Sequence, residues 1–284
     1  MKQKTIYDHI RQQGYSRREF LNMCAVLAGA MGFHAVSPLK ANGINAGIEQ
    51  TDGLTKLVAE ALENKPRLPI IWLEMHDCAG CTEAFVRSQS LTAVDLILNQ
   101  IAVEYHETLS AAAGFQIEQN KQAIMEEYQG QYLLVVEGSV PTAAAGAYCT
   151  IGGRTALDHL QEAASGAAAI IAVGNCASFG GIPHANPNPT AAKGIGDVLS
   201  SNSVVNVPGC PTIPEVITGL IANYIVTGKM PGLDGLNRPK TYYGRTIHDR
   251  CQRLPFFNLG KFADSFDDDG AKNGWCLFLL GCKG

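Results

Sequence analysis

Short apolar segments separated by helix-like segments are the feature that most constrains the fold of this chain. The apolar segments cover residues 69–75, 101–106, 132–137, 168–173 and 204–207. Helix-like segments begin at Thr82 and recur at residues 115–128, 154–164, 193–200 and 214–226. Apolar strands that alternate with helices are typical of a parallel sheet with helices on both faces. We therefore predict an α/β fold from about Pro66 to Lys229.

Cysteines follow three of these predicted strands directly. Cys78 and Cys81 come after the first strand, Cys176 after residues 168–173, and Cys210 after residues 204–207. The carboxyl ends of parallel strands meet at the edge where open α/β sheets bind ligands, so we expect these thiols to converge. Glycines within two residues of Cys81, Cys176 and Cys210 let the backbone approach a cluster. Four thiolates suit a [4Fe–4S] cluster.

A second group of soft ligands lies after residue 230, where no long helical or strand pattern is present. Its members are His248, Cys251, Cys276 and Cys282. A long segment without regular structure needs another source of order, and a bound metal contributes folding free energy. Ligand type alone fits zinc as well as a second cluster, but the neighbouring cluster site favours electron transfer. We place the domain boundary between residues 229 and 230.

The roles of other residues near the first group stay open. Cys149 is either a buried small residue or a fifth thiol, and free cysteine is commonly buried. Glu137, at the end of its strand, is either a proton relay or a hydrogen-bond acceptor. His76 and Asp77 adjoin Cys78 and are not counted as ligands. The odd total of nine cysteines argues against a disulfide framework.

The N-terminus carries an export signature. Residues 16–21 read SRREFL, a twin-arginine motif, and residues 23–36 form an apolar stretch too short for an ordinary transmembrane helix. We expect residues 1–45 to be a signal peptide that lies outside the fold, carries Cys24, and is cleaved between about Val36 and Glu49. The twin-arginine route carries folded proteins, so clusters could be inserted before export. An ordinary amphipathic N-terminal helix is the alternative.

Composition and missing motifs exclude several classes of function. The net charge is −4 and the estimated pI is 6.0, and no basic patch suited to nucleic acid is present. The sequence contains no GxGxxG after a strand, no phosphate-binding GxxxxGK[ST], no HExxH and no GxSxG. The acidic residues 264–269 read as a solvated loop. A chain that binds two clusters and little else is best suited to moving electrons.

Together these motifs resemble the small, electron-transferring subunit of the [NiFe] hydrogenases. The resemblance runs from about Pro66 to the last residue and includes many motifs in the family's order. They are CAGCTE at 78–83, EGS at 137–139, GNCASFGG at 174–181, PNP at 187–189, PGCP at 208–211, HDRC at 248–251, GWC at 274–276 and GCKG at 281–284.

The resemblance implies a flavodoxin-like domain over residues 46–229 and an iron–sulfur domain over residues 230–284. The proximal [4Fe–4S] cluster would then be bound by Cys78, Cys81, Cys176 and Cys210. The distal [4Fe–4S] cluster would be bound by His248, Cys251, Cys276 and Cys282. The nickel–iron site would lie in a partner large subunit, so this chain would relay electrons to an acceptor such as a cytochrome, in H₂ oxidation or evolution. We expect the complex in the periplasm, at the outer face of the cytoplasmic membrane.

Two departures from the family pattern add expectations. Ligands for a medial [3Fe–4S] cluster would lie beyond Gly284, so we expect the chain to be truncated at its C-terminus, with membrane association only through partners or that missing segment. Oxygen-tolerant members have extra cysteines at the positions of Gly80 and Gly181, so we expect an ordinary four-cysteine cluster and ordinary oxygen sensitivity. A hydrogen-sensing subunit, a respiratory-complex subunit with one cluster and a zinc-stapled module are the alternatives. The export signature argues against the first, and the second ligand group against the single-cluster subunit.

Overall fold

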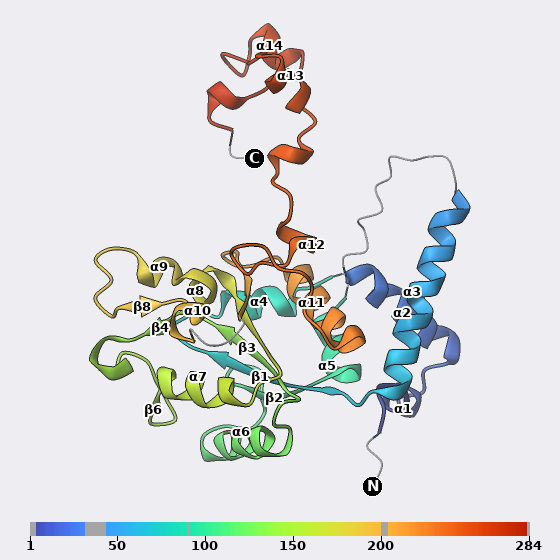
Figure 1. Ribbon diagram of the computed structural model, residues 1–284, viewed down its shortest axis with the longest axis vertical. Coiled ribbons are helices and arrows are strands. Elements are labelled where there is room, and N and C mark those ends of the chain that lie inside the picture. The colour runs from blue at the N-terminus through green and yellow to red at the C-terminus, as the bar shows by residue number, and fades with distance from the viewer. Residues whose placement is uncertain (1–3, 32–43, 90, 200–203, 283–284) are drawn as a thin grey trace. The chain divides into compact units, whose positions relative to one another are not determined.

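A five-stranded parallel sheet forms the centre of the molecule (Figure 1). The computed structural model describes residues 4–31, 44–89, 91–199 and 204–282. In sheet order the strands are β2 (Ile101–His106), β1 (Leu68–Glu74), β3 (Leu133–Glu137), β7 (Ala169–Val173) and β9 (Val204–Val207). This is the flavodoxin-like strand order, in which the chain reverses its direction of winding between β1 and β3. The predicted fold is confirmed.

The strands are mostly apolar because helices cover both faces of the sheet. On one face, α6 (Phe115–Glu127) and α7 (Ala156–Ser165) pack on side chains such as Leu134 and Ala172. On the other face lie α4 (Gly80–Val86), α5 (Ala93–Asn99) and α11 (Pro214–Thr227). There the rings of Trp72 and Phe85 pack with their centroids 5.2 Å apart. Both layers therefore bury apolar side chains against the strands, which accounts for the continuous apolar pattern.

Four of the strands end level with one another, which brings the following loops to one edge. Glu74 of β1 pairs with Glu137 of β3, Glu137 with Val173 of β7, and Val173 with Val207 of β9. Since the strands are parallel, every segment that leaves one of these residues starts from the same edge of the sheet.

Smaller elements surround this edge and complete the first part of the chain. Two antiparallel pairs are β4 (Val140–Pro141) with β8 (Ala192–Lys193), and β5 (Thr150–Ile151) with β6 (Arg154–Thr155). The short helical elements are η2 (Ala143–Gly146), α8 (Gly174–Phe179), α9 (Gly181–His184) and α10 (Ile195–Val198). The sequence predicted the segment at 193–200 as a helix, and only α10 is helical there.

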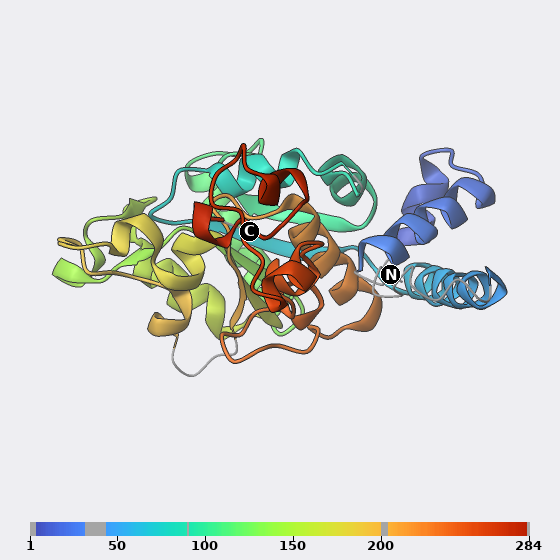
Figure 2. The ribbon, with the colours of Figure 1, turned by 90° about the horizontal axis from the view of Figure 1, so that it is seen from above.

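The N-terminal segment packs onto the fold, contrary to our expectation. It forms α1 (Ile6–Gln12) and α2 (Arg17–Ala30), which lie beside α3 (Ile44–Asn64) in both views (Figures 1 and 2). Ile6, Ile10 and Phe20 are fully buried. They pack there because the apolar residues of these helices gather on one face. The signal peptide over residues 1–45 stays a prediction. The region of the predicted cleavage point lies mostly outside the described residues.

Residues 242–284 form a second compact unit, and residues 1–241 form the first. The second unit contains only short helical elements in its described part. The helix α12 (Lys240–Tyr243) contains the boundary between the two units in the sequence. The other elements of the second unit are η3 (His248–Arg250), α13 (Leu254–Asn258), α14 (Asp269–Lys272) and η4 (Phe278–Leu280). The described helices include none with the length and apolar character needed to cross a membrane.

Candidate functional site

The four cysteines of the first group lie on segments that leave the common edge of the sheet. Cys78 is in the loop after β1 and Cys81 is in the first turn of α4. Cys176 is in α8, which starts directly after β7, and Cys210 follows β9. Cys81 is buried, Cys176 is half-buried, and Cys78 and Cys210 are exposed. Described segments from three distant parts of the sequence therefore bring thiols to one edge, next to the point where the strand order reverses.

Glycines make room for the sulfurs of this group. A Cβ atom on Gly174 would lie 2.5 Å from the Sγ atom of Cys81, and one on Gly181 would lie 2.6 Å from the Sγ atom of Cys176. Both glycines have positive φ angles, +87° and +56°, which other residues rarely adopt. The backbone is thus built closely around the sulfurs of Cys81 and Cys176.

The thiols of the first group influence one another. Burial raises the pKa of the Cys81 thiol to about 12, a backbone N–H from Thr212 opposes this rise, and Cys78 and Cys176 add to it. Burial also raises the pKa of Cys176, against an N–H from Ile182, and the nearby Cys210 and Cys78 act in the same direction as burial. Thiols that raise each other's pKa in this way would be stabilised as thiolates by a bound cation.

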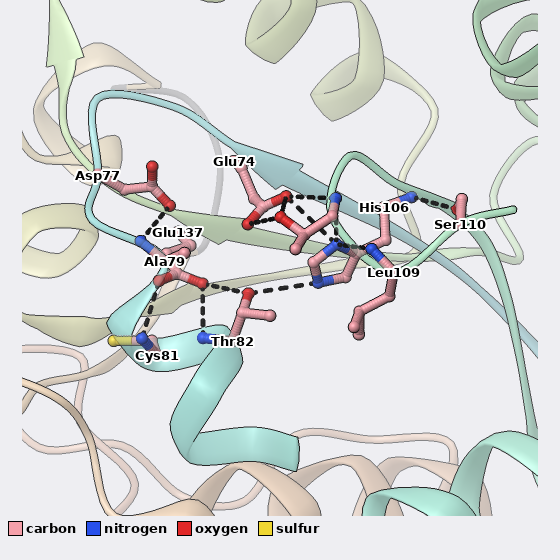
Figure 3. A network of polar contacts seen from close by, with 10 residues as sticks. Glu74, Asp77, Ala79, Cys81, Thr82, His106, Leu109, Ser110 and Glu137 are labelled. Atoms are coloured by element: carbon pink, nitrogen blue, oxygen red, sulfur yellow. Dashed lines mark hydrogen bonds and ion pairs between the residues drawn. The ribbon is translucent and has the colours of Figure 1, made fainter. Parts of the chain in front are cut away.

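Glu137 fixes the start of α4, and with it the backbone of Cys81 (Figure 3). Its carboxylate accepts the backbone N–H groups of Cys81 and Thr82, each at 2.8 Å, and the Thr82 hydroxyl at 2.6 Å. The side chain is buried at the end of β3. Hydrogen bonds to a buried carboxylate are among the stronger ones in proteins. Of the two roles left open for Glu137, these bonds directly account for the acceptor role.

A second buried carboxylate continues this network toward β2 (Figure 3). The Nε2 atom of His106 lies 3.3 Å from the Thr82 hydroxyl, and its Nδ1 atom lies 3.3 Å from a Glu74 oxygen. Glu74 also accepts the N–H of Thr108 at 2.8 Å. Although burial acts to raise it, hydrogen bonds from His106 and Thr108 hold the pKa of Glu74 below its ordinary value.

An acidic trio forms where the two carboxylates meet the loop after β1. Single oxygens of Glu74, Asp77 and Glu137 all lie within 4.8 Å of one another. Burial raises the pKa of Asp77 to about 6, and the charges of Glu137 and Glu74 contribute further. Asp77 also accepts the backbone N–H of Ala79 at 3.3 Å, which helps to shape the turn between Cys78 and Cys81.

Sequence reasoning missed Glu74, Thr82 and His106, and a signal for two of them was present. Glu74 and His106 are polar residues at the ends of two apolar strands that reach the same edge. Of the residues left open, Cys149 is half-buried against the apolar core of the α6–α7 face, which supports the packing role. His76 forms backbone hydrogen bonds in both directions with Ser139, so its backbone is structural. The structure contains no disulfide among the nine cysteines.

The second group of ligands lies within the second unit, where three phenylalanines pack together. Phe257 packs against Phe262 and Phe278, with ring centroids 5.8 Å apart in both pairs, and against the ring of His248 at 4.7 Å. The backbone of Cys276 pairs with that of Phe262 in an isolated β-bridge, and Cys282 comes four residues after Phe278. The backbone N–H of Arg253 donates to the Cys251 sulfur at 3.4 Å. The four predicted ligands therefore share one small unit.

Comparisons with known proteins follow the same division of the chain. A model of the family described as "NADH ubiquinone oxidoreductase, 20 Kd subunit" matches residues 78–224, and a model of the C-terminal region of the NiFe/NiFeSe hydrogenase small subunit matches residues 243–284. The "Hydrogenase-2 small chain" of Escherichia coli K12 is 43% identical over 275 residues, which cover 97% of this chain and 69% of that protein. The chain belongs to the small-subunit family of the NiFe hydrogenases. The "Uptake hydrogenase small subunit" of Azotobacter vinelandii is 42% identical over 282 residues, 99% of this chain and 74% of that protein.

Solved structures place this small subunit in the same fold. The recombinant [NiFeSe] hydrogenase from Desulfovibrio vulgaris Hildenborough aligns with a TM-score of 0.67 and 33% identity, over 78% of this chain and 83% of that one. The actinobacterial-type NiFe-hydrogenase from Ralstonia eutropha H16 aligns with a TM-score of 0.64 and 26% identity, over 77% and 70% of the two chains. The predicted identity is confirmed: the chain is a hydrogenase small subunit, part of an oxidoreductase. The second family match also distinguishes it from a respiratory-complex subunit with a single cluster.

Proposed function

We propose that this small subunit relays electrons between a nickel–iron site in a partner large subunit and an external acceptor, through two [4Fe–4S] clusters. Cys78, Cys81, Cys176 and Cys210 would bind the proximal cluster. The observation that carries this proposal is the alignment of strand ends at one edge, from which the thiols arise. When bound, such a cluster supplies a one-electron redox centre.

The chain's own residues position the ligands in this proposal. Gly174 and Gly181 leave space for the sulfurs of Cys81 and Cys176. The N–H groups of Thr212 and Ile182 face these sulfurs and stabilise their anionic form. Glu137 holds the turn that carries Cys81, because it accepts two backbone N–H groups there. In this proposal, the sheet and these contacts position the ligands for the cluster.

The distal cluster would be bound by His248, Cys251, Cys276 and Cys282. These residues equally suit zinc by type. The match of residues 243–284 to a hydrogenase small-subunit family supports the cluster. Ring packing of Phe257 on His248 orients the imidazole, which favours binding through a defined ring nitrogen.

The partners and the compartment follow from the same proposal. The solved relatives are hydrogenases, which supports a large subunit as the partner. We propose a cytochrome-like protein as the acceptor. The SRREFL signature at residues 16–21 supports export of the folded subunit to the periplasm, with a signal of about 45 residues. We propose residues 46–229 and 230–284 as the two functional domains.

Metal and sulfide analysis of the purified protein tests the two-cluster proposal. We expect about eight iron atoms and about eight acid-labile sulfides per chain, the sum for two four-iron clusters. Zinc without sulfide would contradict the proposal for either site. A result of about four irons and one zinc per chain would support the proximal cluster and would show that the second site holds a structural zinc instead of a cluster.

A further inference from the structure

The N-terminal helices are held on the first unit by an apolar contact. On their side, Ile6, Ile10, Phe20, Cys24 and Leu27 are fully buried. Helices α1 and α2 lie against α3, and α2 also contacts α11 (Figure 1). On α3, Val58 and Leu62 are fully buried as well. Burial of each large apolar side chain contributes about 1.5–3 kcal/mol relative to exposure, so this contact is the main source of the docking free energy.

Polar contacts fix the position of the docked helices. The backbone N–H of Ile6 donates to the Lys65 carbonyl at 2.8 Å, and the Gln13 amide donates to the Leu98 carbonyl at 3.2 Å. The Lys65 ammonium donates to the carbonyls of Ile225 and Val226 at 2.7 and 2.9 Å, which joins the end of α3 to the C-terminal turn of α11. The docking surface is therefore built from elements of the α/β domain.

The residues of the export signature take part in this packing unequally. Ser16 caps α2 together with Glu19, and Phe20 is fully buried. Arg17 pairs with Glu63 of α3, and its guanidinium lies 5.1 Å from the ring centroid of Phe20. Arg18, in contrast, is exposed. The side chain of Arg17 is still 51% exposed, so its ion pair contributes only about 0–1 kcal/mol.

We propose that α1 and α2 form an intramolecular mask, in which the face of α3 and α11 binds the twin-arginine segment of the folded precursor and competes with the export receptor for it. A receptor that reads both arginines and the aromatic residue must displace Phe20 and Arg17 from this face. Export then requires α2 to detach. This inference rests on the proposed export route, but the docking itself can be measured without export.

Two matched variants of α1 separate docking from general effects of charge. Ile10→Asp places a carboxylate at a fully buried site, and Gln12→Asp places the same charge at an exposed site of the same helix. Neither changes residues 16–36. The readout is alkylation of Cys24 in the cluster-loaded, full-length precursor, located by mass spectrometry. Burial shields this thiol and raises its pKa to about 12.

We expect slow alkylation of Cys24 in the native precursor and in Gln12→Asp. In Ile10→Asp we expect alkylation at least about tenfold faster, which corresponds to about 1.4 kcal/mol of lost docking. Hydrogen exchange in β3 and β7 should stay unchanged, which shows that the domain itself remains folded. Glu63→Gln should accelerate alkylation by less than about fivefold, in keeping with an exposed ion pair. Native Cys24 that reacts as fast as in urea would overturn the docking.

Export kinetics in cells then test the masking. We expect Ile10→Asp to be exported faster than the native precursor, and Gln12→Asp to behave like the native precursor. Equal export of both variants, with Cys24 exposed only in Ile10→Asp, would overturn the mask. If no variant is exported at all, the proposed export route fails instead, while the alkylation result still decides whether the segment is docked.

Discussion

The sheet-edge site and the C-terminal site differ in what stabilises the structure around them. The strands of the first unit are almost entirely buried, and helices cover both faces of the sheet. In the described part of the second unit, residues 242–282, Ala263 is the fully buried apolar residue, and large side chains such as Leu259, Phe266 and Phe278 are exposed. The first unit therefore has an apolar core of its own, and the second has almost none.

This contrast assigns different roles to the two proposed clusters. The first unit buries a large apolar surface, so we expect it to fold without a cluster and to position the proposed proximal ligands in advance. We expect the second unit to depend on its ligand set, because its hydrogen bonds and its partly or largely exposed phenylalanines supply little free energy of folding. Metal binding should therefore contribute to function at the first site and to both function and folding at the second.

Substitution of one ligand in each site should give the largest difference in folding between the two regions. We expect Cys176→Ala and Cys276→Ala each to lose about four irons per chain. Only Cys276→Ala should unfold residues 242–282, which hydrogen exchange and limited proteolysis would detect. The sheet strands should stay protected in both variants.

Cys149→Ala is the control for loss of a thiol. It should keep about eight irons, because Cys149 packs against the apolar core. A loss of iron in this variant would make Cys149 a ligand. Equal protection of residues 242–282 in Cys176→Ala and Cys276→Ala would remove the contrast between the two regions.

Core truncation should affect the two units unequally. Ile171, in the middle of β7, is fully buried, and Ile171→Ala should lower the free energy of unfolding of the first unit by about 2–5 kcal/mol. Leu259 in the second unit is 70% exposed, so Leu259→Ala should change the free energy of unfolding of that unit by less than about 0.5 kcal/mol. Urea unfolding monitored by far-UV circular dichroism measures both. Similar effects of the two substitutions would show that the core does not lie where we place it.

A smaller effect is expected where the sheet holds the proximal ligands. Glu137→Gln keeps the shape of the side chain but removes the charge that accepts three hydrogen bonds, so we expect a loss of about 1–3 kcal/mol of stability. Glu83→Gln on the exposed side of α4 removes only the pair with Arg87 and should cost about 0.5 kcal/mol or less. Equal losses in urea unfolding would mean that Glu137 does not fix α4.

As the pH falls, the contribution of His159 to the first unit should be lost before that of Asp268 to the second. His159 is buried, and its Nδ1 atom accepts a hydrogen bond from the Lys121 ammonium at 2.7 Å. Burial lowers the pKa of His159 from 6.5, and the charge of Lys121 lowers it further. A hydrogen bond with the Ile151 carbonyl acts in the opposite direction. The unfolded chain then binds a proton that the folded chain does not, so stability present above pH 6.5 is lost as the pH falls toward the lower folded pKa. In the second unit, Asp268 has a pKa lowered from 3.8 by the N–H of Ala271, so its contribution is lost only below that range.

Urea unfolding of the native chain and of His159→Gln measures this pH dependence. Burial raises the pKa of Asp77 to about 6, which acts in the opposite direction, so the contribution of His159 is read from the difference between the two proteins. Between about pH 7.5 and about pH 5.5, the native first unit should lose stability relative to the variant. Parallel slopes would show that His159 is not the group responsible. Hydrogen exchange assigns the change to one unit or the other.

The sequence predicted the sheet well but not the packing of the N-terminal helices, for physical reasons. Strands buried on both faces are continuous apolar runs, so β2 and β9 were predicted residue by residue, and the glycine-flanked cysteines followed from their place after strands. The docking of α1 and α2 could not be read in the same way, because it depends on complementarity with α3 and α11. The bonds of Glu137 to α4 likewise depend on the register of β1 and β3, which aligns Glu74 with Glu137.

Reduction by H₂ of the complete enzyme, with its large subunit present, tests the central claim most directly. Electron paramagnetic resonance would count the one-electron centres that this chain contributes. We predict two such centres in the native chain, and one in Cys276→Ala with the proximal centre still reducible. A chain whose iron–sulfur absorption and resonance signals do not respond to H₂, although the large subunit is bound and active, would contradict the proposed electron relay.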